Sequence, residues 1–105
     1  MPTGATNCPM RPEAKLEKYF VDTARSLGYL QYKFTAGETG VPDRILIGNN
    51  KTVFVELKAL NGVLSERQKL IHKQIRARGG TVFTPFSKQD IDKIFKFMQK
   101  NIAQE

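Results

Sequence analysis

Two short strings of the sequence place ionisable side chains where they could do chemistry together: residues 40–44 (GVPDR) and residues 54–58 (FVELK). Successive side chains of a β-strand alternate between its two faces, so Glu56 and Lys58 point to the same side. Asp43 enters the preceding strand and can reach the same place. Two carboxylates beside an ammonium suit a hard divalent cation and a phosphate. The two strings therefore predict a site for a cation and a phosphate on one β-hairpin.

The hairpin that would carry this site has clear limits in the sequence. Residues 44–48 form one strand and residues 52–59 form the next. Asn49-Asn50 lies between them and suits a two-residue turn, because Asn tolerates the positive φ that such turns need. An earlier strand is predicted over residues 30–35, with apolar side chains on one face and polar side chains, among them Lys33, on the other.

Helices are predicted on both sides of these strands. Residues 13–27 carry apolar side chains at helical spacing, with Pro12 suited to the helix entry and Gly28 to its exit. The next helix opens at Ser65 with a capping box and continues to Gly79-Gly80. A fourth strand spans residues 81–85, and a last helix begins after a Ser87 cap, with a buried stripe of Ile91, Ile94, Phe95 and Met98. The predicted order is helix, three strands, helix, strand, helix.

The composition indicates one basic globular domain. The chain has 105 residues, enough for one core, and 17 Lys+Arg against 10 Asp+Glu give it a net charge of +7. Residues 1–12 are predicted to be a flexible tail and residues 13–105 the domain. Basic charge favours nucleic acid or an anionic membrane, but no apolar run reaches the roughly 18 to 20 residues of a membrane span. With Cys8 as its single cysteine, the chain can form no internal disulfide, and we expect a reducing cytoplasm.

The order of elements and several short strings resemble the PD-(D/E)XK nuclease superfamily. Within it, the chain is similar to a stand-alone VRR-NUC domain of the small phage and bacterial kind. The similar residues are Glu17 within residues 16–19, Lys33-Phe34, residues 40–44, residues 54–59, and Leu64-Ser65 with Gln68. They span roughly residues 13–80. The resemblance implies an α/β single-domain fold of restriction-endonuclease type, in the order αβββαβα, with a mixed central sheet flanked by helices.

The resemblance also implies a catalytic site that cuts phosphodiesters with Mg²⁺, for which Mn²⁺ could substitute. Asp43, Glu56 and the backbone carbonyl of Leu57 would hold the ion, and Glu17 would complete the acidic cluster directly or through a water. Taken alone, Glu17 reads as a solvated glutamate at the edge of an apolar stripe. Lys58 would orient the attacking water or stabilise charge on phosphorus.

Gln68 has two readings, between which the sequence does not decide. The resemblance places its amide at the edge of the catalytic site, where it could bind the catalytic lysine or a phosphate oxygen. Its spacing from Ser65 instead makes it the second member of a capping box. One side chain is not expected to fill both roles easily.

Basic side chains near the hairpin are candidate DNA contacts. On the helix that follows it, Lys69, Lys73 and Arg76 could bind phosphates, which would give affinity without reading sequence. The alternative is an ordinary solvated face. His72, the single histidine, is predicted to lie on a polar face, so contact with phosphate, or no role at all, is favoured over a general-base role. Lys33 shares the polar face of the first strand, next to the hairpin that carries Asp43, and is a further candidate substrate contact, as is Arg44 beside Asp43.

The function that the resemblance favours is a homodimeric nuclease that resolves four-way (Holliday) DNA junctions, in a bacterial cell or a phage-infected host. A small chain without a separate binding domain gains surface and a second cutting site by pairing. Phe97, which falls off the buried stripe of the last helix, is a candidate dimer contact. The alternatives are a nickase or restriction-like nuclease on ordinary duplex DNA, and a DNA-binding module without activity.

Overall fold

The computed structural model describes residues 12–58 and 62–100. Its elements are α1 (Pro12–Ser26), β1 (Leu30–Lys33), β2 (Arg44–Gly48), β3 (Lys51–Val55), α2 (Glu66–Ala77), β4 (Val82–Phe83) and α3 (Lys88–Gln99). The predicted order is therefore confirmed. Most of the predicted tail, including Cys8, lies outside the described residues, while Pro12 is the first residue of α1. Within the described ranges, no helix is long and apolar enough to cross a membrane.

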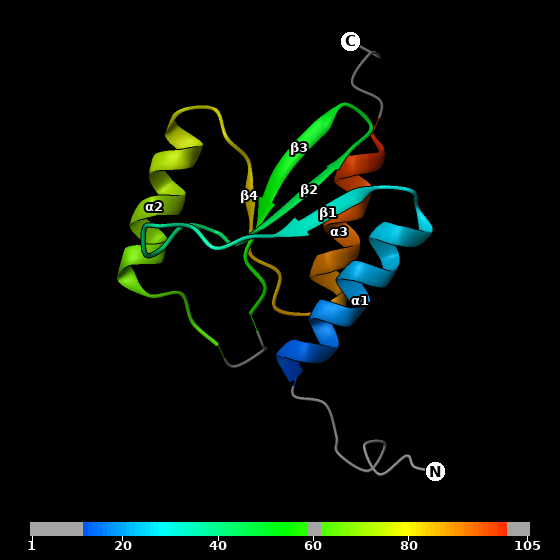
Figure 1. Cartoon of the computed structure of the whole chain (residues 1–105), viewed down its shortest axis with the longest axis horizontal. Coiled ribbons are helices and arrows are strands. Elements are labelled where there is room, and N and C mark those ends of the chain that lie inside the picture. The colour runs from blue at the N-terminus through cyan, green and yellow to red at the C-terminus, as the bar shows by residue number, and fades with distance from the viewer. Residues whose placement is uncertain (1–11, 59–61, 101–105) are drawn as a thin grey trace.

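The four strands form one mixed sheet in the order β1-β2-β3-β4. The pairs β1/β2 and β2/β3 are antiparallel, whereas β3 and β4 run parallel. Asn49 and Asn50 have φ angles of 50° and 64°, as predicted for the hairpin turn. Because Lys33 pairs with Arg44, and Arg44 with Val55, the end of β1, the start of β2 and the end of β3 meet at one end of the sheet (Figure 1).

Two layers of helices enclose the sheet. Figure 1 shows α1 and α3 together on one face and α2 on the opposite side, next to β4. The core lies between the sheet and the α1–α3 layer, where the rings of Phe20 and Phe95 have centroids 5.6 Å apart. Its buried members are Leu16, Phe20 and Ala24 of α1, Leu46, Val53, Val55 and Leu57 of the hairpin, and Ile91, Ile94, Phe95 and Met98 of α3.

The edge strand β1 turns its polar face toward α1. Leu30 and Tyr32 share the opposite face and are 54% and 55% exposed. The predicted alternation of β1 is thus present, but the apolar face is the one that meets solvent. On its polar face, Gln31 accepts a hydrogen bond from Arg44, and Lys33 forms an ion pair with Glu17 of α1.

The third strand is shorter than predicted, although its backbone continues in extended form. Beyond β3, the amide of Glu56 donates to the carbonyl of Phe83 at 2.9 Å, and the amide of Lys58 donates to that of Pro85 at 3.1 Å. These bonds prolong the parallel pairing past Val55 and fix the path of the acid and the lysine. Ala59, the predicted last residue of this strand, lies outside the described residues.

The far end of the sheet is tied to the last helix. The Asn49 side-chain amide donates to the carbonyls of Met98 (2.8 Å) and Lys100 (3.0 Å), and Lys51 Nζ reaches the Met98 carbonyl at 3.2 Å. The hairpin turn thereby binds carbonyls that a helix leaves unpaired at its C-terminus. On the same helix, Phe97 packs edge-on against Phe83 with ring centroids 5.3 Å apart, so it is partly covered within the chain. Its role as a dimer contact stays a prediction.

Candidate active site

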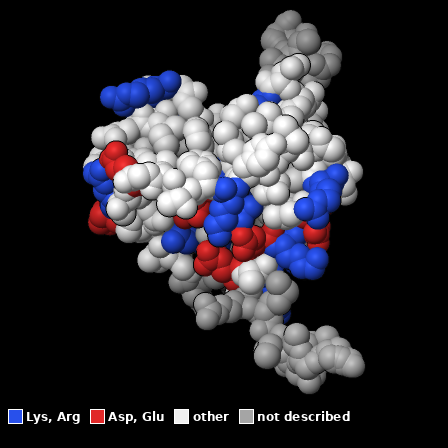
Figure 2. Space-filling view, viewed as in Figure 1, with Lys and Arg blue, Asp and Glu red and all other residues white. Residues whose placement is uncertain are grey.

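A cavity of about 40 Å³ opens at the end of the sheet where β1, β2 and β3 meet. Its lining residues are Glu13, Glu17, Lys33, Asp43, Arg44, Glu56 and Leu57. Figure 2 shows acidic side chains gathered near the start of α1, with basic side chains on either side of them. The structure therefore brings together four residues that the sequence proposed as cation ligands: Glu17, Asp43, Glu56 and Leu57.

The backbone of the sheet positions the two hairpin carboxylates. The carbonyl of Asp43 accepts a hydrogen bond from the amide of Phe34 at 2.8 Å, and Pro42 before it is fully buried. Glu56 is held by its bond to β4 and is only 9% exposed. Both carboxylates thus project from anchored backbone, which reduces the entropy lost when a ligand orders them.

The environment of Glu56 disfavours its charged form. Burial raises the pKa of Glu56, and the negative charge of Asp43 raises it further, while Lys58 opposes the shift and Glu13 adds to it. Two carboxylates that repel each other are stabilised by a cation between them. The cavity is therefore electrostatically prepared for a positive ion.

The donor set fits Mg²⁺. Among the described residues, no three His, Cys, Asp or Glu side chains are grouped to hold a metal. Mg²⁺ keeps several waters and needs only one or two carboxylates. Asp43 and Glu56 supply these, and Leu57, whose side chain belongs to the core, also lines the cavity.

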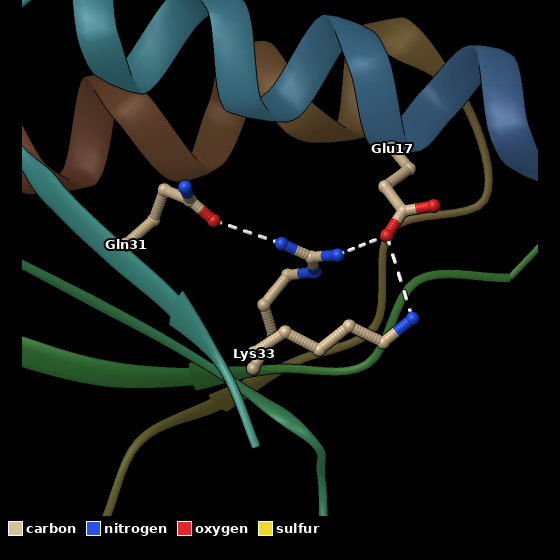
Figure 3. A network of polar contacts seen from close by, with 4 residues as sticks. Glu17, Gln31 and Lys33 are labelled. Carbon is tan, nitrogen blue, oxygen red and sulfur yellow. Dashed lines mark hydrogen bonds and ion pairs between the residues drawn. The ribbon is translucent and has the colours of Figure 1, made fainter.

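Glu17 belongs to a separate ionic network within the same cavity (Figure 3). The Arg44 guanidinium donates from Nη2 to the Glu17 carboxylate and from Nη1 to Gln31 Oε1, the latter at 2.8 Å. Lys33 Nζ lies 3.5 Å from the same Glu17 oxygen. The Arg44 side chain is 5% exposed and its guanidinium lies 5.8 Å from the centroid of Phe20. Arg44 faces α1 rather than solvent, so its prediction as a DNA contact is wrong.

Gln68 completes the capping box and also reaches the candidate site, where it contacts Glu56 and not the catalytic lysine that the resemblance implied. Its side-chain Oε1 accepts a hydrogen bond from the backbone amide of Ser65 at 2.8 Å. The backbone amide of Gln68 donates to Ser65 Oγ at 3.1 Å, which completes the capping box. Its Nε2 donates to Glu56 Oε2 at 3.3 Å. The expectation that one side chain could not easily do both is wrong, because the amide's acceptor and donor point in different directions.

His72 is buried, contrary to its predicted place on a polar face. It is 1% exposed, whereas the apolar Leu70 of the same helix is 45% exposed. The face of α2 that meets the sheet carries Gln68, Ile71 and His72, so the helix is rotated from the predicted phase. Neither imidazole nitrogen has a hydrogen-bond partner in the part of the chain that the structure describes. Burial lowers the pKa of His72, and the charges of Arg76 and Lys58 lower it further. A contact of His72 with phosphate is excluded by this burial.

The other basic residues of α2 differ in their freedom to meet DNA. Lys69 is exposed and lies 3.2 Å from Glu66, a contact of the kind that water screens strongly. Lys73 is also exposed. Arg76 donates from Nη2 to the carbonyl of Val82 at 2.9 Å, which ties its guanidinium to β4. Contact with phosphate stays a prediction for Lys69, Lys73 and Arg76, whose side chain is also exposed.

Two residues at the site, Glu13 and Gln31, were not predicted from the sequence. Glu13 lines the cavity one helical turn before Glu17, and this spacing of four residues could have revealed it. Gln31 shares the polar face of β1 with Lys33 and binds Arg44. The strand alternation placed Gln31 correctly, but nothing in the sequence indicated that its face would be covered.

A comparison with solved structures shows what the fold is similar to. A chain described as a VRR_NUC domain matches with a TM-score of 0.75 and 29% sequence identity, over 83% of this chain and 97% of that one. No family model and no curated protein matches the chain. The match spans nearly the whole of the other domain, and the hairpin and its helices are in the order that the resemblance implied. The chain therefore has the fold of a VRR-NUC domain, and the match supports a nuclease domain of that kind.

Proposed function

We propose that the chain is a divalent-cation-dependent endonuclease that hydrolyses phosphodiesters in DNA. The observation that carries this proposal is the convergence of Asp43 and Glu56 on one cavity, where burial and mutual repulsion favour the binding of a cation. When bound, Mg²⁺ supplies charge screening for the phosphate and a more acidic water. Asp43 and Glu56 would hold it, with the Leu57 carbonyl as a third oxygen donor.

Lys58 and Gln68 complete the proposed chemistry. Lys58 follows Glu56 by two residues, and its charge is felt at Glu56. An ammonium there can stabilise the negative charge that grows on the phosphate as water attacks. Gln68 holds one oxygen of Glu56, which restricts the carboxylate to one orientation. The chain's own residues thus bind, orient and stabilise charge.

Branched DNA and a homodimer are the finer parts of the proposal. A net charge of +7 supports a polyanionic substrate. The exposed side chains of Leu30 and Tyr32 support a second copy of the chain on the open face of β1, since paired aromatic and aliphatic surface is typical of such contacts. Two copies would supply the two cuts that a four-way junction needs.

Cleavage of labelled four-way junction, flap and linear duplex, with Mg²⁺ or with EDTA, tests the activity. We expect Mg²⁺-dependent cutting of the junction and none by Asp43→Asn. Equal cutting of linear duplex would instead favour a nickase or restriction-like enzyme. Binding without cutting in any metal would favour a DNA-binding module.

Light scattering at micromolar protein tests the dimer. Tyr32→Glu places a charge on the open face of β1 and is expected to shift a dimer toward monomer. Lys96→Glu on the exposed face of α3 is the matched control. A dimer that is unaffected by Tyr32→Glu would place the contact elsewhere.

A further inference from the structure

The acidic side chains of the cavity fall into two electrostatic classes. Glu17 has two cationic partners, Arg44 and Lys33. Within residues 12–58 and 62–100, no lysine or arginine lies within ion-pair distance of Asp43 or Glu56. The negative charge of Glu17 is therefore already compensated, whereas the other acidic residues that line the cavity, Asp43, Glu56 and Glu13, have no such ion pair among the described residues.

Arg44, the partner of Glu17, carries a buried positive charge that requires a counter-ion. The Arg44 side chain is 5% exposed, and its guanidinium is enclosed by Glu17, Gln31 and the ring of Phe20. A buried guanidinium whose carboxylate is removed retains the cost of desolvation without its compensation. Gln31 offers only a neutral acceptor. Glu17 is thus needed by the protein itself, whether or not a cation is bound.

We propose that Glu17 is the internal counter-ion of Arg44 and not a ligand of the divalent cation, so that the cavity binds one cation through Asp43 and Glu56. This inference rests on the proposed metal-dependent function, and it departs from the acidic cluster of three that the family resemblance implies. Glu17 acts through Arg44 as a positioning residue that holds α1 against the start of β2.

The lysine at the edge of β1 strengthens the distinction. Lys33 Nζ lies 3.5 Å from the Glu17 oxygen that Arg44 also binds, and its side chain is 60% exposed. Two positive groups on one carboxylate oxygen leave little negative potential there for a metal ion. Deep in the cavity, at the end of the sheet, a cation meets Asp43 and Glu56, which have no ion pair among the described residues; Glu13 at the start of α1 also lacks one.

Binding of Mn²⁺ alone, followed by the electron paramagnetic resonance signal of the free ion, tests the ligand set without DNA or turnover. We expect one Mn²⁺ per chain. Asp43→Asn should weaken binding by about 100-fold or more, beyond the usual loss for an outer-sphere partner. Glu17→Gln should weaken it by about tenfold, because it leaves Arg44 and Lys33 uncompensated near the ion.

The discriminating variants restore the charge balance. Glu17→Gln with Lys33→Gln removes one exposed positive group, and Glu17→Gln with Arg44→Gln removes the buried one. Each is expected to bring Mn²⁺ affinity back toward wild type, whereas Asp43→Asn with Lys33→Gln should stay weak. Failure of both restorations, with Glu17→Gln as damaging as Asp43→Asn, would make Glu17 a ligand and overturn the inference.

Thermal unfolding without metal gives a second readout. Glu17→Gln should lower Tm more than the double variant with Arg44→Gln does, since only the single variant leaves a buried charge unpaired. A wild-type chain that binds no Mn²⁺ at all would overturn the proposed metal-dependent function and, with it, the inference of one cation. The counter-ion role of Glu17 is tested by the unfolding measurements alone. Equal destabilisation by the single and double variants would remove the counter-ion role.

Discussion

The Gln68 amide donates to the Glu56 carboxylate across 3.3 Å while its oxygen caps the first turn of α2. The start of a surface helix is thereby connected to an anionic group at the end of the sheet. A change at the helix cap is transmitted to the orientation of a proposed metal ligand. The Gln68 side chain thus couples the cap of α2 to the orientation of Glu56 in the proposed site.

Gln68→Ala separates these roles when it is compared with Ser65→Ala. Both changes remove the capping box and should lower the free energy of unfolding by about 1 kcal/mol. Only Gln68→Ala also releases Glu56, so only it should reduce turnover beyond the effect of stability. We would measure denaturant unfolding and single-turnover cleavage for each. Equal activity in the two variants would make Gln68 a cap alone.

Lys58→Ala tests the role of the ammonium. We expect turnover to fall by about two to three orders of magnitude, the usual cost of losing one donor to transition-state charge. Mn²⁺ affinity should change far less than in Asp43→Asn, because the lysine is not a ligand. A loss of metal affinity as large as that of Asp43→Asn would show that the lysine is structural.

Glu56→Gln is expected to stabilise the metal-free fold at neutral pH. The folded-state pKa of Glu56 is raised above its ordinary value of 4.5, so the folded state gains a proton more readily than the unfolded state. The stability that this group contributes is fully present below pH 4.5 and is lost as pH rises through the folded pKa. The neutral amide avoids this loss. Thermal unfolding at pH 7 with EDTA should give a higher Tm for the variant, and a lower one would contradict the shift.

His72 should give the opposite dependence on pH. The folded-state pKa of His72 lies below its ordinary value of 6.5, so as the pH falls the unfolded state binds a proton first. Stability is therefore expected to fall as pH drops from above 6.5 toward the folded pKa. The free energy of unfolding should depend less steeply on pH between pH 8 and pH 5 in His72→Leu than in the parent chain. Both should carry Glu56→Gln to remove the opposing titration, and an unchanged slope would show that His72 is not held neutral.

The exposed lysines of α2 can be tested on DNA of any sequence. Lys69→Ala with Lys73→Ala should weaken binding and reduce the magnitude of the salt slope by about 0.9 for each lost phosphate contact. Lys93→Ala with Lys96→Ala on α3 is the matched control for net charge. If both pairs change the slope alike, the α2 face has no special contact with DNA.

Local chemistry in the sequence predicted much of this molecule. The Asn49-Asn50 turn, the Ser65 cap and the alternation of β1 all follow from short-range rules, and the structure confirms them. The hairpin carboxylates were found in the same way, since strand geometry and spacing are local.

Tertiary contacts decided what short-range rules could not. The polar face of β1 is partly covered because Arg44 binds Gln31 on that face and Glu17 of α1, and Glu17 and Arg44 are far apart in the chain. The rotation of α2 that buries His72 is likewise set by what faces the helix. A lone buried arginine or histidine breaks the usual pattern of hydrophobicity, so neither could be recognised from periodicity.

The bonds from Asn49 and Lys51 to the last turn of α3 have a consequence for how the chain opens. They join two segments that are nearly fifty positions apart, at the end of the sheet away from the cavity. Local opening of the hairpin turn releases the carbonyls of α3 as well, so the two segments should exchange their amide hydrogens as one cooperative unit. Motion at the acidic cavity can then occur without loosening this far end.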